Sequence, residues 1–394
     1  MMFNKKAKVL GVVVLLIVCV GVALAAAGGD ERVASDVELV RTPDGGIQPQ
    51  AVVDERGTVH LIYFKGDPKG GDVYYARRAP GDAAFSKPIR VNSEPGTAIA
   101  MGTIRGAHIA VGRGGRVYVT WNGVKPAVDG KPGTVPVWYT RMNDQGTGFE
   151  PQRNLITWAY GIDGGGGIAA DREGNVYVLW HGGAYGKGEA ERAVYLAYSD
   201  DDGRSFARER RISPTTKGVC GCCSLRAFAD EAGNLYVVFR DAGDGVHRNT
   251  DLLVSMDRGE TFSFATVQPW KLNACPMSSA SIAEDARGTV LAWQRKEQVY
   301  YTHVQPGTTE MGTPQPAPGT PGERKHPVLV GGRDGKLLFA WTEGTGWSRG
   351  GSLHWQEYDR EGKPVGSTGS ADGVPAWSLA TGYVNPEGAF VLVY

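Results

Sequence analysis

Gly174-Asn-Val-Tyr-Val is the stretch of sequence that decides the fold, because six other segments of the chain repeat its pattern. In each copy a glycine follows a turn and opens a strand of alternating or continuous apolar residues. The other copies begin at Gly57, Gly115, Gly233, Gly288, Gly335 and Gly388, with spacings of 58, 59, 59, 55, 47 and 53 residues between successive glycines. A period of this size with strand patterning predicts an all-β chain folded as a β-propeller.

The third repeat shows how one blade is organised. It contains four runs rich in β-branched and aromatic residues, each ending at a turn-forming residue, which predicts a four-stranded blade. The runs are residues 167–171, 175–180, 193–198 and 206–212.

The number of repeats predicts seven blades, with six as the alternative if the last copy packs differently. The last repeat supplies only two strands, at residues 377–384 and 390–394. Residues 37–41 resemble an outer strand, and we expect them to complete this blade. The two ends of the chain would then close the ring and remove an exposed sheet edge.

The repeats and the composition point to one large domain. The repeated pattern covers residues 36–394, which predicts a single propeller rather than several domains. The chain has 42 Lys and Arg residues and 42 Asp and Glu residues, so its formal net charge is zero. Because the sequence also lacks a long basic run, a nucleic-acid partner is not expected.

Residues 1–27 have the composition of an export segment. Lys5, Lys6 and Lys8 precede an apolar run that continues to Ala27 and ends in small residues, as in a secretory signal peptide. The run is nearly long enough to span a bilayer, so an uncleaved membrane anchor is the alternative. Both readings predict a periplasmic or extracellular protein that contacts the membrane only through this segment.

A second motif lies between the third and outer strands of two blades. Both copies fit the pattern S-x-D-x-G-x-[ST]-[FW]. Their defining residues are Ser199, Asp201, Gly203 and Phe206 in one copy, and Ser255, Asp257, Gly259 and Phe262 in the other. We expect the Ser and Asp side chains to bind the turn backbone, the Gly to adopt a positive φ and the aromatic ring to pack beneath. Asp201 and Asp257 are therefore predicted to be turn residues rather than catalytic acids.

This motif resembles the Asp-box, or BNR repeat, of the sialidase-like propellers, and the resemblance covers almost all of residues 36–394. It implies a propeller of the class that includes exo-sialidases. In that family three arginines hold the substrate carboxylate, the first within an Arg-Ile-Pro motif, beside an Asp acid/base and a Tyr–Glu pair. Here no Arg-Ile-Pro occurs, and Pro88-Ile89-Arg90 has a different order. The resemblance therefore implies the fold without placing the arginine triad.

Arginines and histidines gather in the loops that we expect to surround the central channel. A guanidinium binds carboxylate, sulfate or phosphate groups in a bidentate manner, so these residues predict a glycan or an anionic small molecule as the ligand. The predicted ligand-binding residues are Arg105, His181, Arg240, Arg248, Arg295 and His326, and the same loops contain His108 and Arg226. Alternatively, Arg240 and Arg248 pair with Asp241 and Asp251 and only order their loop.

Hydrolysis of a glycoside requires two carboxyl groups at one bond. Asp241 is the leading candidate because it directly follows the second strand of the fourth blade, and Glu343 is the predicted partner, at the equivalent place in the sixth. Aromatic residues in nearby loops are candidates for stacking on a sugar ring. They are Trp158, Tyr160, Tyr185 and Trp347.

Four cysteines belong to two consecutive loops of the same predicted face. Cys220, Cys222 and Cys223 precede the fourth blade, and Cys275 precedes the fifth with Met277 two residues later. In an exported protein, two disulfides are one interpretation. A thiolate site for Cu(I) or Zn²⁺ is the second, and a redox-active thiol is the third. The combination of CxCC, a tryptophan and Ala-Cys-Pro-Met is similar to a bacterial subgroup of sialidase-like proteins.

Three functions follow from these patterns. The first is an exported sialidase-like propeller that binds an anionic or glycan ligand at the channel mouth and hydrolyses it if a carboxylate pair converges there. The second is a copper, zinc or redox protein centred on the cysteines. The third is a non-catalytic interaction module at the cell surface, in which the cysteines are structural.

Overall fold

The computed structural model describes residues 37–125, 133–183, 187–221, 223, 225–332 and 334–394. The chain divides into residues 1–33 and residues 34–394, and all described residues belong to the second unit. The predicted export segment, residues 1–27, therefore lies outside the described residues. Among the described residues, no helix has the length and apolar character needed to cross a membrane.

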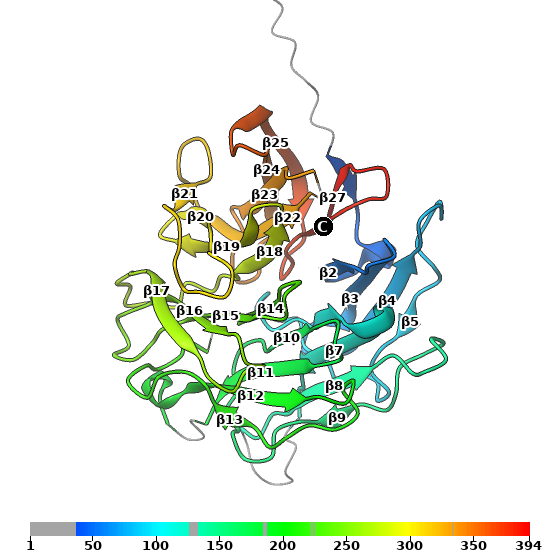
Figure 1. The fold of residues 1–394 in the computed structure, drawn as a ribbon, viewed down its shortest axis with the longest axis vertical. Coiled ribbons are helices and arrows are strands. Elements are labelled where there is room, and N and C mark those ends of the chain that lie inside the picture. The colour runs from blue at the N-terminus through cyan, green and yellow to red at the C-terminus, as the bar shows by residue number, and fades with distance from the viewer. Residues whose placement is uncertain (1–36, 126–132, 184–186, 222, 224, 333) are drawn as a thin grey trace, which may run out of the picture. The chain divides into compact units, whose positions relative to one another are not determined.

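Seven sheets are arranged around a central axis, so the predicted seven-bladed propeller is confirmed (Figure 1). In six sheets the strands follow one another in chain order from the axis outward and pair antiparallel. Blade 1 contains β2 (Ile47–Val53), β3 (Val59–Asp67), β4 (Gly70–Arg78) and β5 (Ile89–Arg90). Blade 2 contains β6 (His108–Val111), β7 (Val117–Asn122), β8 (Val137–Arg141) and β9 (Arg153–Asn154). Blade 3 contains β10 (Gly167–Ala170), β11 (Val176–Gly182), β12 (Ala193–Ser199) and β13 (Arg210–Arg211).

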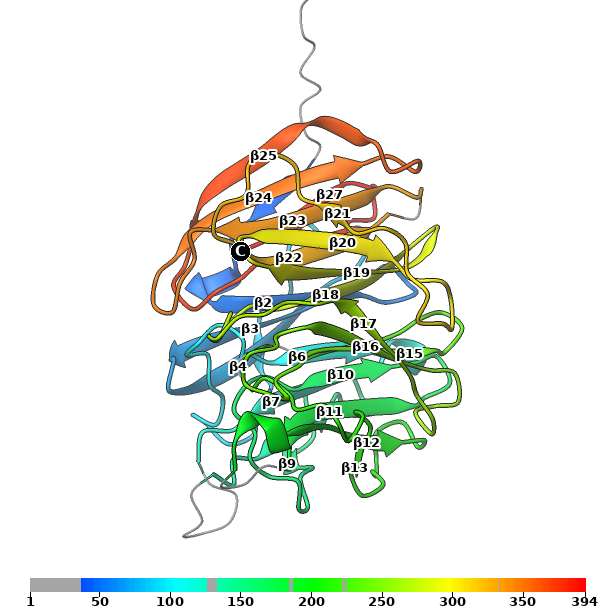
Figure 2. The ribbon, with the colours of Figure 1, turned by 90° about the vertical axis from the view of Figure 1, so that its left-hand side faces the viewer.

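The next three blades have the same strand order. Blade 4 contains β14 (Arg226–Ala229), β15 (Leu235–Arg240), β16 (Thr250–Ser255) and β17 (Ser263–Gln268). Blade 5 contains β18 (Ser281–Asp285), β19 (Gly288–Arg295), β20 (Gln298–His303) and β21 (Gln315–Pro316). Blade 6 contains β22 (Arg324–Gly331), β23 (Leu337–Glu343), β24 (Gly351–Tyr358) and β25 (Pro364–Val374). Figure 2 shows β25 at the outer edge of this blade.

The seventh blade joins the two ends of the described chain. It consists of β26 (Thr381–Val384), β27 (Phe390–Val393) and β1 (Glu38–Val40), in that order from the axis outward. The segment expected to complete this blade does so, and β1 pairs parallel to β27. The prediction of four strands per blade holds for six blades, whereas this sheet has three strands among the described residues.

The repeated phrase builds the turn between the first and second strands of each blade. In blade 3 the Asp171 Oδ1 atom accepts the backbone N–H groups of Glu173 and Asn175, each at 2.9 Å. Gly174 lies inside this turn with φ +96°, and the other six repeat glycines also have φ between +80° and +109°. Only glycine adopts this conformation without steric cost, which explains why the phrase always begins with it.

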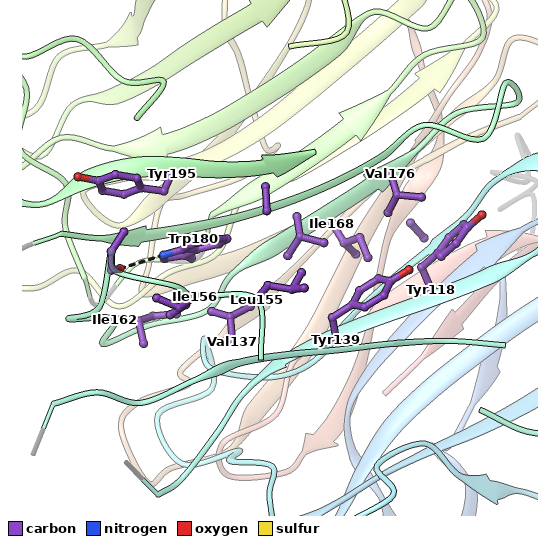
Figure 3. Packing of buried hydrophobic residues seen from close by; sticks show 14 of the residues in the cluster. Tyr118, Val137, Tyr139, Leu155, Ile156, Ile162, Ile168, Val176, Trp180 and Tyr195 are labelled. Carbon is purple, nitrogen blue, oxygen red and sulfur yellow. Dashed lines mark hydrogen bonds between the residues drawn. The ribbon is translucent and has the colours of Figure 1, made fainter. Parts of the chain in front are cut away.

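Apolar cores fill the spaces between consecutive blades. Between blades 2 and 3, Tyr118, Val137 and Tyr139 pack against Val176 and Trp180 (Figure 3). The same arrangement recurs at each blade boundary, including the one between blades 7 and 1. Because successive residues of a strand face opposite sides, each second strand contributes to two cores and has to be apolar on both faces.

Large aromatic residues end several second strands and pack between blades. Each of these side chains is at most 2% exposed. They are Trp121, Trp180, Phe239, Trp293 and Trp341.

Both S-x-D-x-G-x-[ST]-[FW] segments form closed turns. The Asp201 Oδ1 atom accepts the Ser199 hydroxyl at 2.8 Å and the Ser205 N–H at 2.8 Å, and the Asp257 turn repeats this pattern with Ser255 and Thr261. Gly203 and Gly259 have φ of +73° and +83°. Burial of Asp201 opposes its ionisation, but the hydrogen bonds from Ser205 outweigh this and lower its pKa to about 2. The phenyl ring of Phe206 packs edge-on against Tyr139, and Phe262 packs against the core between blades 3 and 4.

Candidate functional site

A cavity of about 290 Å³ lies on the propeller axis, lined by the first strands of all seven blades. Most of its wall consists of small or aliphatic residues, as expected where seven strands approach one another. Polar side chains line one part of the wall, and we call the group Gln50, His108, Arg226 and Ser279 the channel mouth. Among the described residues of the cavity wall, Arg226 alone has a permanently charged side chain.

Arg226 extends from blade 4 to three other blades. Its Nε atom donates to the Ala280 carbonyl at 3.0 Å, and its Nη1 atom donates to Gln50 Oε1 at 3.2 Å and to His108 Nδ1. No carboxylate of the described residues forms an ion pair with Arg226, and burial lowers its pKa to about 10. Burial, with a contribution from Arg226, also holds the pKa of His108 well below its usual value. The mouth therefore contains one positive charge and no described negative charge.

Arg240 and Arg248, the predicted ligand-binding arginines on blade 4, form their hydrogen bonds and ion pairs with other groups of the protein. Arg240 is 6% exposed and donates to the Arg248 carbonyl at 2.8 Å and to the Gln294 carbonyl at 3.0 Å, while its guanidinium lies over Trp270. Arg248 forms an ion pair of 2.9 Å with Glu189. Neither residue pairs with Asp241 or Asp251, so the alternative that predicted those pairs is wrong. Both arginines still order the loop, through partners that the sequence did not indicate.

The other two predicted arginines lie in different surroundings. Arg105 donates from Nη2 to Asp163 Oδ1 at 2.8 Å, and its guanidinium lies over the ring of Trp347. Arg295 is partly exposed and donates to the Pro269 carbonyl at 3.0 Å.

The predicted histidines are buried structural residues. His181 accepts the Gly164 N–H at Nε2 over 3.0 Å, and burial lowers its pKa to about 4. His326 bonds through Nδ1 to the hydroxyl of Ser279 at 3.2 Å, and burial lowers its pKa to about 3. Both are therefore neutral at physiological pH and add no charge to the site.

The two carboxyl groups predicted to act in catalysis bind different basic residues. Asp241 is buried and contacts Lys217 at 3.1 Å. Glu343 contacts Arg324 at 2.9 Å and accepts the indole N–H of Trp341 at 2.9 Å. They belong to blades 4 and 6 and share no described partner. Their catalytic role stays a prediction, and the contacts of both residues are those of structural ion pairs.

Asp241 is part of a buried carboxylate pair bridged by Lys217. The lysine Nζ lies 3.1 Å from Asp241 and 3.6 Å from Asp251, whose side chain is fully buried. Burial raises the pKa of Asp251 to about 6, against the opposing effect of Lys217. Because the folded-state pKa exceeds the unfolded value of about 3.9, folding disfavours ionisation of this group.

Replacing Asp251 with Asn should therefore stabilise the protein above pH 6. The wild-type penalty grows as pH rises from about 4 to about 6 and is constant beyond, so the variant should gain about 1–2 kcal/mol at pH 8 and little at pH 4. Asn retains an acceptor for the Thr266 hydroxyl, which donates to Asp251 at 2.9 Å. Denaturant unfolding at both pH values tests this. Destabilisation at pH 8 that is absent at pH 4 would show that the ion pair with Lys217 dominates instead.

The cysteine loops of blades 4 and 5 lie against each other. Cys220 and Cys223 are buried and are not disulfide-bonded, so in this structure the four cysteines do not form two disulfides. Cys275 is disulfide-bonded, and Cys222 lies outside the described residues. The backbone N–H groups of Met277 and Ser278 donate to the Cys223 sulfur, and the predicted role of the Met277 thioether stays a prediction.

The predicted copper or zinc site remains an expectation. Among the described residues, no group of three or more His, Cys, Asp or Glu side chains is arranged to hold a metal ion. Cys220 and Cys223 are the described cysteines outside a disulfide, and two thiols are fewer than the three or four ligands that Zn²⁺ requires.

Two of the predicted stacking residues are exposed. Trp158 and Trp347 are 45% and 47% exposed, and Glu209 fixes the first of them by accepting the N–H groups of Thr157, Trp158 and Ala159. Tyr160 donates its hydroxyl to the Ile156 carbonyl, and Tyr185 lies outside the described residues.

The residue that best defines the site, Arg226, was noted in the sequence only as one of several loop arginines. Its distinction is the lack of a described acidic partner, which depends on side chains from blades 1, 2 and 5. Glu189 and Lys217, the partners of Arg248 and Asp241, belong to no motif; Glu189 begins the 3-10 helix Glu189–Glu191 and Lys217 lies in a loop. No signal in the sequence could have identified these pairings.

Comparisons with known proteins support the fold. No protein-family model matches the chain, and no curated protein matches it. A crystal structure of a protein of unknown function from Dyadobacter fermentans is similar, with a TM-score of 0.53 and 13% identity, covering 85% of this chain and 96% of that chain. The Hadza microbial sialidase Hz136 matches with a TM-score of 0.48 and 13% identity, covering 75% of this chain and 63% of its own.

An intramolecular trans-sialidase from Ruminococcus gnavus matches with a TM-score of 0.45 and 13% identity, covering 87% of this chain and 88% of that chain. None of these comparisons bears on the cysteine pattern, so the resemblance to a cysteine-containing subgroup stays a prediction. At such identities the similarity concerns the fold alone. The chain is thus a seven-bladed propeller, and the Dyadobacter fermentans protein of unknown function shares its fold.

Proposed function

We propose that this protein is an exported propeller that binds a small anionic ligand, such as the carboxylate of an acidic sugar, at the channel mouth. The observation that carries the proposal is Arg226, whose charge faces the axial cavity with no described carboxylate paired to it. A guanidinium in a poorly hydrated site binds an oxyanion more strongly than it would in water. Export rests on the composition of residues 1–27.

The surroundings of Arg226 favour an anion over a cation or a neutral ligand. Its own hydrogen bonds to Gln50, His108 and Ala280 fix the guanidinium across the mouth. His108 has a strongly lowered pKa and accepts a hydrogen bond without adding a second charge. A ligand carboxylate would therefore meet a preorganised donor and would lose little energy to side-chain ordering.

The size of the cavity limits the ligand. Pockets for small molecules usually have volumes of about 300–1,000 Å³, and the axial cavity is at the lower end with about 290 Å³. One sugar ring or a smaller acid fits this volume, whereas an oligosaccharide would have to extend beyond the mouth. Binding rather than hydrolysis is the proposed activity, because Asp241 and Glu343 are engaged with Lys217 and Arg324.

Replacement of Arg226 with Gln should weaken anion binding about 10- to 100-fold, which corresponds to the loss of one charge-assisted contact. Isothermal titration with N-acetylneuraminate, glucuronate, sulfate and phosphate measures this, with galactose as the neutral probe. Arg295→Gln is the matched control, because Arg295 is a partly exposed arginine outside the cavity wall. If no acidic probe binds the wild type, or if both variants bind like it, the proposal fails.

A further inference from the structure

A second, smaller cavity adjoins the channel mouth. Its volume is about 10 Å³, which is close to the space that one water molecule or one hydroxyl group needs. Gln50, His108, Arg226 and Leu379 line both this cavity and the axial cavity, so the two cavities lie side by side. Gln48 lines only the smaller one.

The side chain of Gln48 brings an unpaired hydrogen-bond acceptor to the small cavity. Its Nε2 atom donates to the carbonyls of Ala100 at 2.5 Å and Trp377 at 2.7 Å, which fixes the orientation of the amide. Its Oε1 atom is buried and has no hydrogen-bond partner in the described part of the chain. Gly106 keeps the space at this oxygen open, because a Cβ atom there would overlap with Oε1. A bound group that donates to Oε1 would therefore satisfy a buried polar atom.

The backbone holds Gln48 in an uncommon conformation. The register between β2 and β3 shifts between Ile47 and Gln50, so Gln48 lies in a bulge, and its φ is +54°. Its N–H group donates to the Ser378 hydroxyl at 3.0 Å, which ties the bulge to the segment that enters blade 7. Left-handed residues and bulges are frequent at functional sites, where they redirect side chains. This bulge brings the Gln48 amide into the wall of the small cavity.

A second bulge of this kind, in blade 6, has a side chain with a partner. The register between β22 and β23 shifts between Lys325 and Val328, and His326 there has φ +50°. Like Gln48, it precedes a proline. Its Nδ1 atom bonds to the Ser279 hydroxyl at 3.2 Å. The bulge conformation therefore does not require an unpaired side chain, and the open acceptor belongs to Gln48 and its surroundings.

We propose that the ligand is a 2-hydroxy carboxylate, whose carboxylate binds Arg226 and whose hydroxyl group donates to Gln48 Oε1. This inference rests on the proposed anion site and adds a second contact to it. Because Arg226 and Gln48 line one cavity with room for a single small group, the hydroxyl has to be on the carbon next to the carboxylate. An amino group there would bring a second positive charge beside Arg226, where no described carboxylate balances it. The site should therefore select a neutral donor.

Isothermal titration with three acids that share one six-membered ring tests this selection. Cyclohexanecarboxylate, 1-hydroxycyclohexanecarboxylate and 1-aminocyclohexanecarboxylate differ only in the group on the carbon next to the carboxylate. The hydroxy acid should bind about 10-fold more tightly than cyclohexanecarboxylate, as expected for one hydrogen bond to a buried acceptor. The amino acid should bind no more tightly than cyclohexanecarboxylate. Equal affinities of the hydroxy acid and cyclohexanecarboxylate would overturn the inference and assign the small cavity to a water molecule.

Two glutamine variants locate the effect. Gln48→Met removes the acceptor while keeping the length of the side chain, and it should bind the hydroxy acid and cyclohexanecarboxylate equally. Gln294→Met is the matched control, because Gln294 is also buried with an Oε1 atom that has no described partner, but it lines neither cavity. This control should keep the 10-fold preference. A preference that survives in Gln48→Met would contradict the assignment.

Two further variants cover a folding failure and separate this inference from the proposed function. If Gln48→Met does not fold, Gly106→Ala should abolish the preference by filling the space at Oε1, and a retained preference would again contradict the assignment. Arg226→Gln should weaken the binding of both acids by a similar factor and preserve their ratio. If none of the three acids binds the wild type, the proposed anion site fails as well. If all bind through Arg226 without a preference for the hydroxy acid, only the present inference fails.

Discussion

Replacing Asp202 with Ala should destabilise the propeller by about 3–5 kcal/mol, because it removes the acid from a buried ionic network. Asp202 is 4% exposed and lies in the turn between β12 and β13 of blade 3. Its carboxylate contacts Arg116 Nε at 2.7 Å and accepts the Tyr118 hydroxyl at 2.8 Å, and Arg141 lies at 3.4 Å. All three partners belong to blade 2, so the variant leaves the Tyr118 hydroxyl without this acceptor. Arg116 and Arg141 keep only their partly exposed acidic partners Asp144 and Glu150.

The second copy of the turn motif offers a matched control. Arg258 occupies the position equivalent to Asp202, and both residues have a positive φ, of +61° and +65°. The Arg258 side chain is exposed and pairs with Glu173, which is exposed as well. Arg258→Ala therefore keeps an ordinary side chain at the same positive φ and removes only a surface ion pair, a loss of about 0–1 kcal/mol.

Guanidinium unfolding of both variants separates the network from the strain. The midpoint of Asp202→Ala should shift far more than that of Arg258→Ala, while Asp202→Asn, which tolerates a positive φ, should isolate the loss of charge. Similar shifts for Asp202→Ala and Arg258→Ala would show that backbone strain, not the ionic network, determines the cost.

The fold could be predicted because each blade repeats the same local requirements. Gly174 and its six equivalents need a positive φ, and the second strands are apolar because both faces are buried. Such requirements act within about ten residues and leave a direct record in the sequence. The three-stranded seventh blade is harder to predict from the sequence, because β1 and β26 are separated by almost the entire chain.

The site was less predictable because it depends on contacts between blades. Arg240 and Arg226 are equally prominent in the sequence, yet Arg240 binds two carbonyls and stacks on Trp270, whereas Arg226 faces the cavity. The partners of each arginine, such as Glu189 for Arg248 and Gln50 for Arg226, are distant from it in the sequence. These partners determine which arginine has no acidic partner. No local motif specifies such long-range pairings.

Trp180 should be among the most costly residues to truncate. It is completely buried in the core between blades 2 and 3, and its indole N–H donates to the Ala159 carbonyl at 3.1 Å (Figure 3). Trp180→Ala would leave a large cavity that the surrounding strands cannot close, at a cost of about 3–5 kcal/mol. The exposed Trp158 is the control of the same residue type, and its truncation should change the unfolding midpoint far less.

Substitution with Phe distinguishes the contribution of packing from that of the hydrogen bond. Trp121 occupies the equivalent position in blade 2, but its buried indole N–H has no hydrogen-bond partner in the described part of the chain. Trp180→Phe removes the indole hydrogen bond, whereas Trp121→Phe removes an indole N–H that has no described acceptor. Trp180→Phe should therefore lower the free energy of unfolding by about 1 kcal/mol more than Trp121→Phe. If Trp121→Phe proves the more destabilising, ring shape rather than hydrogen bonding governs this position. Because a tryptophan occurs here in several blades with different acceptors, the comparison tests whether the repeat is maintained by the volume of the ring.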